Sequence, residues 1–243
     1  EEHDSVGIGM ALAIEAWPAK HRAKAASYVA LGWQVGVLAA ALLTPVLLPH
    51  IGWRGMFVVG IFPAFVAWYL RTRLHEPEIF SRKQSALFTQ KTSKLESFKL
   101  LVKDKATTKV SLGIVVLTSV QNFGYYGIMI WMPNFLSKQL GFSLTKSGLW
   151  TAVTVCGMMA GIWIFGRLAD RIGRKPSFLL FQLGAVISII TYSQLTDPTA
   201  MLVAGAFLGM FVNGMMGGYG ALMAEAYPTE ARATAQNVLF NLG

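Results

Sequence analysis

Long uncharged runs separated by short charged stretches dominate the chain. An α-helix needs about 20 apolar residues to cross the hydrocarbon of a bilayer. The run at 55–70 is short, but Arg54 and Arg71 flank it and can extend their charged ends to the headgroups. The pattern predicts an all-α membrane protein, with partial spans at 5–17 and 233–243. The complete spans are expected at residues 25–53, 55–70, 110–137, 147–166, 176–196 and 198–224.

A short motif occurs near each end of the chain. Residues 15–23 read EAWPAKHRA, and residues 225–233 read EAYPTEARA. A repeat that frames several hydrophobic blocks is typical of transporters built from two homologous helix bundles. We therefore expect the end of an N-terminal bundle (helices 4–6) at 1–72, a cytoplasmic linker at 73–108 and a C-terminal bundle (helices 7–11) at 109–243. This division predicts a fragment, truncated at both ends, of a twelve-helix protein.

Composition favours a membrane protein over a nucleic-acid-binding one. Apolar residues make up 54% of the chain, charged residues only 14%, and the mean hydropathy is +0.49, outside the usual range of soluble domains. The net charge of +9 would suit a nucleic-acid partner in a soluble protein. With alternate connections assigned to the cytoplasm, however, all basic residues except Arg54, Lys138 and Lys146 lie inside. This positive-inside bias predicts a multi-pass protein of the cell membrane, the inner membrane in a bacterium, whose partner is the lipid bilayer.

The side chains that carry chemistry argue against an enzyme. Cys156 is the single cysteine, so an intrachain disulfide is excluded. Apart from Glu2, His3 and Asp4, the spans hold no convergent acids, nucleophiles or metal ligands. We expect no cofactor and no metal. A membrane-embedded enzyme and a non-transporting sensor are the alternative classes, and a sensor would carry a signalling domain outside these residues.

One connection between spans is short and strongly charged. Residues 166–176 read GRLADRIGRKP. Gly166 and Gly173 are expected to permit a tight reversal, Pro176 can start the next helix, and Asp170 can bridge neighbouring elements across this face. The alternative is a positive-inside loop with routine charges.

This segment resembles the Gly-x-Leu-Ala-Asp-Arg-x-Gly-Arg-Lys signature of the major facilitator superfamily, in the loop between helices 8 and 9. The motifs at 15–23 and 225–233 resemble that family's helix 4–5 and 10–11 junctions, and residues 52–77 resemble its helix 5–6 region. Such patterns occur together in its metabolite:proton and sialate:proton symporter groups. The resemblance implies two six-helix pseudo-repeats that rock around a central cavity, in a monomer.

Charges at the repeated motifs and in the loop predict a cytoplasmic gate. Glu15 and Glu225 would lie at the C-terminal ends of helices, where the macrodipole disfavours a carboxylate by up to about 1 kcal/mol. Arg22 and Arg232 follow a helix-breaking proline and can compensate. We expect Glu225, Arg232, Asp170 and Arg174 to form contacts that are made in the outward-facing state and broken in the inward-facing state; a static salt-bridge network is the alternative. The full predicted gate is Gly166, Asp170, Gly173, Arg174, Lys175, Glu15, Arg22, Glu225 and Arg232.

Polar side chains inside the spans are candidates for substrate contact, because hydrocarbon disfavours them unless they face a cavity or each other. In the seventh helix, the i, i+4 pairs Gln121/Tyr125 and Asn122/Tyr126 form a stripe near mid-membrane, and the resemblance places this helix on the central cavity. Interhelical hydrogen bonding is the alternative. The predicted substrate-binding residues are Gln121, Asn122, Tyr125, Tyr126, Gln34 and Asn213.

The amino end carries a candidate proton site. Glu2, His3 and Asp4 lie roughly 16–20 Å along a helix from Glu15, near mid-bilayer. Buried carboxylates beside an imidazole suit proton coupling; a terminus without a role is the alternative. We thus expect proton-coupled symport of a small polar metabolite. The resemblance alone favours an organic acid, and because the spans hold no Lys or Arg to pair with it, a sugar or zwitterion is the alternative.

Overall fold

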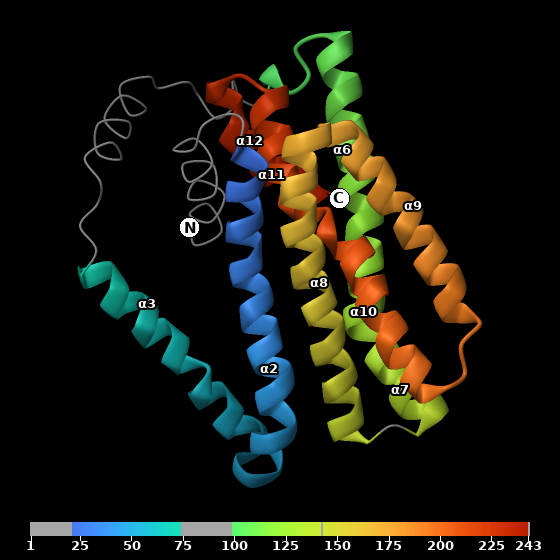
Figure 1. The fold of residues 1–243 in the computed structure, drawn as a ribbon. Helices are drawn as coiled ribbons and strands as arrows, with labels where there is room; N and C mark the ends of the chain where they lie inside the picture. Colours follow the sequence, from blue (N-terminus) through green and yellow to red (C-terminus); the bar gives the residue numbers. More distant parts are fainter. Residues whose placement is uncertain (1–20, 74–98, 142, 243) are drawn as a thin grey trace.

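A computed structural model describes residues 21–73, 99–141 and 143–242 (Figure 1). The predicted proton-site residues Glu2, His3 and Asp4, and Glu15 of the predicted gate, lie outside these ranges. The described secondary structure is helical. Its elements are α2 (Arg22–Val59), α3 (Ile61–Arg73), α6 (Lys105–Tyr126), the π-helical segment η2 (Gly127–Trp131), α7 (Met132–Leu140), α8 (Leu144–Ile172), α9 (Arg174–Ser193), α10 (Pro198–Gly214), α11 (Met216–Ala226) and α12 (Thr229–Leu242).

Five stretches of the described helices have the length and apolar composition to cross a membrane: Ala23–Val66, Lys105–Lys138, Thr145–Ile172, Arg174–Ser193 and Pro198–Ala226. The first is 44 residues long and covers the spans predicted at 25–53 and 55–70. Gly52, with a φ of 64°, breaks it, and α2 and α3 run in opposite directions (Figure 1). The two predicted spans therefore form one helical stretch interrupted at Gly52.

Local sequence signals set several helix ends. Asp104, Ser143 and Asp197 each accept a hydrogen bond from a backbone N–H three residues on, which caps α6, α8 and α10 respectively. Gly141 ends α7 in the left-handed conformation, with a φ of 65°. Gly173, with a φ of 94°, separates α8 from α9. The three caps fix where α6, α8 and α10 begin, and the two glycines let the chain turn sharply after α7 and α8.

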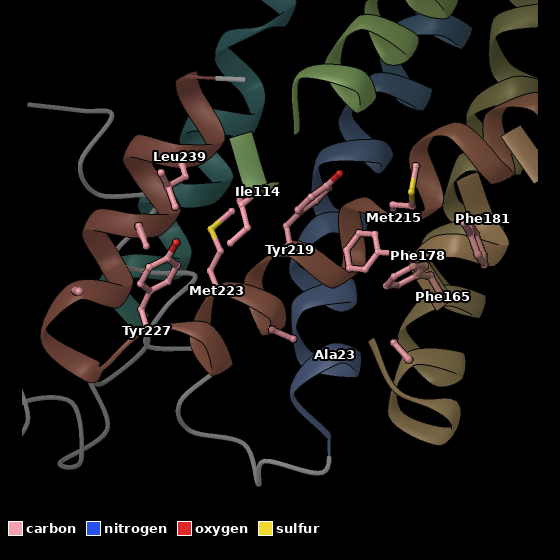
Figure 2. Close-up of a cluster of buried hydrophobic side chains, with 14 of the residues drawn as sticks. Ala23, Ile114, Phe165, Phe178, Phe181, Met215, Tyr219, Met223, Tyr227 and Leu239 are labelled. Carbon is pink, nitrogen blue, oxygen red and sulfur yellow. The ribbon is translucent and has the colours of Figure 1, made fainter. Parts of the chain in front are cut away.

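Aromatic side chains fill the core between α8, α9 and α11. Phe165 contacts Phe178 and Phe181 edge to face, with ring centroids 4.9 and 5.1 Å apart, and Phe178 contacts Tyr219 at 5.3 Å (Figure 2). Such aromatic pairs contribute about 0.5–1.5 kcal/mol each beyond the area they bury. This core holds together helices that all belong to the predicted C-terminal bundle.

Two glycines of α8 bring that helix into backbone contact with α10. A side-chain carbon at Gly157 would overlap the Ala206 carbonyl, and one at Gly161 would overlap the Met210 carbonyl. Small residues at such crossings are how helices pack closely in lipid, where no hydrophobic force drives them together. The α8–α10 contact therefore depends on the absence of side chains at these two positions.

The helix that begins with α6 continues through η2 into α7. Gly127 opens η2, and Pro133 follows near the start of α7. On the preceding turn, a side-chain carbon at Gly124 would lie 2.9 Å from a methyl group of Val212. A π-helical turn interrupts the regular hydrogen-bond pattern of an α-helix, so this span contains two α-helical parts joined by a wider turn.

Large apolar side chains cover the outer surface. Phe62 of α3, Ile187 of α9 and Phe207 of α10 are 71%, 64% and 53% exposed. Exposed apolar side chains of this size are unfavourable in water but suit contact with lipid. The buried polar groups consequently stand out against an apolar background.

Candidate functional site

Asp170, near the C-terminal end of α8, connects three helices. Its Oδ1 accepts a hydrogen bond from Arg174 of α9 at 2.9 Å, and its Oδ2 accepts one from the backbone N–H of Lys24 at 3.3 Å. Lys24 lies in the first turn of α2, where backbone N–H groups lack partners within the helix and favour a negative charge. The Asp170 side chain is only 5% exposed. A single carboxylate thus joins the predicted N-terminal and C-terminal bundles.

Arg174 extends this contact to α11. It donates to Asp170, to the Ala169 carbonyl at 2.6 Å and to Glu225 Oε1 at 2.7 Å. The flat guanidinium group suits several charge-assisted hydrogen bonds at once. Glu225 lies in the last turn of α11, where the helix dipole disfavours an acid, and Arg174 compensates for that placement. We call Lys24, Asp170, Arg174 and Glu225 the charged cluster.

Arg232 contacts the corner between α11 and α12. Its Nε donates to the Tyr227 carbonyl at 3.1 Å, and Glu225 forms an ion pair with Arg174. Arg232 therefore supports the backbone after the helix break, while Arg174 pairs with Glu225. Arg22 is the first residue of α2.

The two glycines of the charged loop have different roles. The predicted role of Gly166 in the turn is wrong, because it lies inside α8, where a side-chain carbon would overlap Ser27 Oγ of α2. Gly166 instead allows α2 and α8 to approach each other. Gly173 does supply the reversal, because its φ of 94° is unfavourable for residues with a side chain. Lys175 follows it and is exposed.

Sequence reasoning missed the role of Tyr227. Its hydroxyl lies 2.7 Å from Ser111 Oγ, which in turn donates to the Leu101 carbonyl at 2.7 Å. Burial raises the pKa of the Tyr227 hydroxyl. Through these bonds the corner before α12 is attached to α6. The signal available in the sequence was the aromatic residue that follows Glu-Ala in both copies of the repeat.

Two predicted substrate residues lie together within the helix bundle. Gln121 of α6 and Asn213 of α10 are each 2% exposed. Gln121 Nε2 donates to Asn213 Oδ1 at 3.1 Å and lies 3.8 Å from Met216 Sδ. Among the described residues, Gln121 Oε1 and Asn213 Nδ2 have no hydrogen-bond partner. We call these two side chains the amide pair, which leaves one acceptor and one donor unsatisfied.

The other predicted substrate residues spread over two helices. Trp33 Nε1 of α2 donates to the Tyr125 hydroxyl of α6 at 3.4 Å. The rings of Tyr125 and Tyr126 meet at 5.5 Å, but Tyr126 is 53% exposed, and Asn122 is half-buried. Gln34 is 1% exposed, and its Oε1 has no partner among the described residues. The residues of the predicted stripe therefore do not face one common site, since Gln121 faces α10 while Tyr126 is largely exposed.

The match to known families is decisive. The family model described as the Major Facilitator Superfamily matches residues 5–243. The chain belongs to the major facilitator superfamily. This confirms the predicted family and its all-α membrane fold. No solved structure matches the chain.

Relatives of this superfamily member carry transporter names. A Haemophilus influenzae protein with the provisional name of a metabolite transport protein is 87% identical over 98% of this chain and 59% of its own length. The cis,cis-muconate transport protein of Acinetobacter baylyi is 30% identical over 98% of the chain and 60% of its own length. A sialic acid transporter of Escherichia coli is 26% identical over 98% of the chain and 59% of its own length. The chain therefore spans about three fifths of the length of these relatives.

The described residues add nothing that points to a metal centre. Among them, no group of three or more His, Cys, Asp or Glu side chains is placed to hold a metal ion.

Proposed function

We propose that the protein is a secondary active transporter that carries a small polar metabolite across the bacterial inner membrane by alternating access, coupled to protons. The family and the names of the relatives support transport. Muconate and sialic acid, which two relatives are named for, are organic acids. The observation that carries the proposal is the contact of Asp170 with both bundles.

The charged cluster has the properties of a gate. Asp170 and Arg174 are nearly buried, while the side chain of Glu225 is 39% exposed, so water reaches one edge of the cluster. Hydrogen bonds to charged groups contribute about 1.5–3 kcal/mol each, and about 1.4 kcal/mol changes a population ratio tenfold. Making or breaking the Lys24–Asp170 contact can therefore shift the balance between two states of the bundles. We assign this end to the cytoplasm, following the distribution of basic residues.

The amide pair suggests the kind of group that the substrate presents. Gln121 Oε1 needs a donor, and Asn213 Nδ2 needs an acceptor. A carboxylate only accepts, whereas a protonated carboxyl group both donates and accepts. An organic acid that travels with its proton would therefore satisfy both atoms, which links substrate and proton coupling. Sugar hydroxyls have the same capacity and make a sugar the second candidate. Glu2, His3 and Asp4 stay predicted proton-coupling residues.

Uptake by the full-length transporter in proteoliposomes tests the proposal. Organic acids and sugars would be supplied with and without an inward proton gradient. We expect gradient-dependent uptake of an acid, and we expect Asp170→Asn to lower it about tenfold, which corresponds to one lost charge-assisted contact. Asp197→Asn is the matched control, because Asn also caps a helix well and Asp197 caps α10, which begins at the end of the bundle opposite the α8–α9 connection (Figure 1). Uptake by Asp170→Asn at the rate of the unaltered protein would rule out the gate, and uptake without any gradient dependence would rule out proton coupling.

A further inference from the structure

A small pocket lies beside the charged cluster. Its volume is about 290 Å³, and it is lined by His21, Lys24, Arg167, Asp170 and Arg171. We call it the basic pocket. At about 30 Å³ per water molecule, this volume corresponds to roughly ten waters, which is ample for a phosphate group. One wall comes from the first turn of α2 and the residue before it, and the other comes from the last two turns of α8.

The charges around the basic pocket are unbalanced. Lys24, Arg167 and Arg171 contribute three positive charges against the one negative charge of Asp170, so the lining carries a net charge of +2 with His21 neutral. Within the ranges that the structure describes, no acid forms an ion pair with any of the three lining cations. An anion in the pocket would therefore meet uncompensated positive charge.

Two side chains are held with hydrogen-bonding capacity to spare. The guanidinium carbon of Arg167 lies 3.5 Å from the centre of the Trp163 ring, and Nη1 donates to the Trp163 carbonyl at 3.4 Å. Since a guanidinium group has five N–H donors, Arg167 is fixed in place and keeps donors for a ligand. His21 Nδ1 is buried without a partner among the described residues, and a ligand hydroxyl or phosphate oxygen would satisfy it.

We propose that the basic pocket binds a phosphate group, either the headgroup of an anionic lipid or a free phosphate compound. The guanidinium groups of Arg167 and Arg171 and the ammonium group of Lys24 can together donate hydrogen bonds to several oxygens of one phosphate. Basic pockets between helices at the cytoplasmic face are also suited to anionic headgroups. Because α2 and α8 supply opposite walls, a bound phosphate would hold the two bundles together. This second step rests on the proposed alternating-access function, whereas the binding itself does not.

Native mass spectrometry of the full-length transporter tests the binding step. One arm titrates phosphatidylglycerol against phosphatidylcholine, and the other titrates inorganic phosphate. We expect saturable binding of one phosphatidylglycerol or of inorganic phosphate, weakened about tenfold in the double variant Lys24→Gln/Arg171→Gln, since charge-assisted contacts are lost. The matched control is Lys105→Gln/Lys109→Gln, which removes two exposed lysines of α6 that do not line the pocket.

The outcomes separate the possibilities. Loss of binding in Lys24→Gln/Arg171→Gln but not in the control variant supports the site. The titration in which this loss occurs, with phosphatidylglycerol or with inorganic phosphate, identifies the source of the phosphate group. Equal loss in both double variants, or no saturable binding in either arm, would overturn it. If the double variant does not fold, the single variant Arg171→Gln replaces it, because this side chain is exposed. Binding is measured without transport, so failure of the transport proposal and failure of the site are distinguishable.

A spin-label distance between the two bundles tests the second step. Adding the bound phosphate compound should raise the population with a short distance at the charged end in the unaltered transporter but not in Lys24→Gln/Arg171→Gln. An unchanged distance distribution after saturable binding would refute the link to the closed state.

Discussion

The two long faces of α8 make contrasting contacts. Toward α10, Gly157 and Gly161 meet the backbone carbonyls of Ala206 and Met210. Toward α2, a side-chain carbon at Gly166 would meet the hydroxyl oxygen of Ser27. Both contacts depend on glycine, but one is backbone against backbone and the other is backbone against side chain.

The two interfaces of α8 also differ in what holds them together. The α2–α8 contact carries the Lys24–Asp170 hydrogen bond, which water can replace when the helices part. The α8–α10 contact joins helices of one predicted bundle and is closely packed along two successive turns. One face of α8 is therefore packed so as to stay attached, and we expect the other to separate and close again during transport. Two substitutions in α8 test this difference, and two substitutions elsewhere are expected to have smaller effects.

A leucine at position 157 should produce the largest effect. Gly157→Leu would push its side chain into the Ala206 carbonyl, and because backbone cannot yield as a side chain can, we expect a loss of more than about 3 kcal/mol of stability, at the upper end of overpacking effects. The folded yield in size-exclusion chromatography measures this. Gly113→Leu is the control, because nothing lies within 4 Å of that position. A normal yield for Gly157→Leu would show that the α8–α10 contact is not rigid.

A valine at position 166 should leave the fold intact but alter the balance of states. Gly166→Val displaces Ser27 and separates α2 from α8 near the charged cluster, so we expect a folded protein with uptake reduced about tenfold, equivalent to about 1.4 kcal/mol. Spin-label distances across this end should lengthen. We expect Gly157→Leu to lose its folded yield. If Gly166→Val also fails to fold, the two faces of α8 do not differ as proposed.

Changes to the amide pair should affect substrate affinity more than the fold. Gln121→Leu removes the acceptor Oε1 that a substrate donor would meet and should raise the KM for uptake about fivefold, equivalent to about 1 kcal/mol for the lost hydrogen bond. The single variant Asn213→Leu and the double variant Gln121→Leu/Asn213→Leu complete a mutant cycle in which the two effects should not add. Unchanged KM values with a lowered thermal midpoint would assign the pair to helix packing.

The N-cap of α6 should give the smallest effect. Hydrogen bonds from Thr107 lower the pKa of Asp104 from its usual 3.8. A carboxyl group with a lowered folded pKa stabilises the protein above its unfolded pKa, and that contribution disappears as the pH falls through the folded value. Asp104→Asn keeps a cap and should unfold at nearly the same temperature at pH 7, while its midpoint falls less than that of the unaltered protein between pH 4 and pH 2. Identical pH profiles would show that the carboxylate contributes no cap energy.

Much of the fold could be predicted because apolar runs and charged turns are local signals. The charged loop identified Asp170 and Arg174 from one short segment, and Glu225 followed from the repeat. The break at Gly52 was less visible, because a glycine in an apolar run does not reveal its φ. For the same reason the sequence could show that Gly166 is special but could not distinguish a turn from a close approach.

The pairing of distant residues could not be predicted. Gln121 and Asn213 were each recognisable as polar groups within a span, but their contact depends on how α6 crosses α10. The partner of Asp170 in the predicted N-terminal bundle is the backbone N–H of Lys24, a group that every residue except proline has, so no side-chain pattern could mark it. The contacts of Gly157 and Gly161 likewise follow from helix crossings that are fixed only by the complete packing.

The π-helical segment η2 has a mechanical consequence. A wider turn, followed closely by Pro133, which has no backbone N–H to donate, gives this span less resistance to bending than an unbroken α-helix. On one side of it Gln121 is anchored to α10, and on the other lies α7. The span can therefore bend at Gly127–Trp131 at lower cost than at a regular α-helical turn.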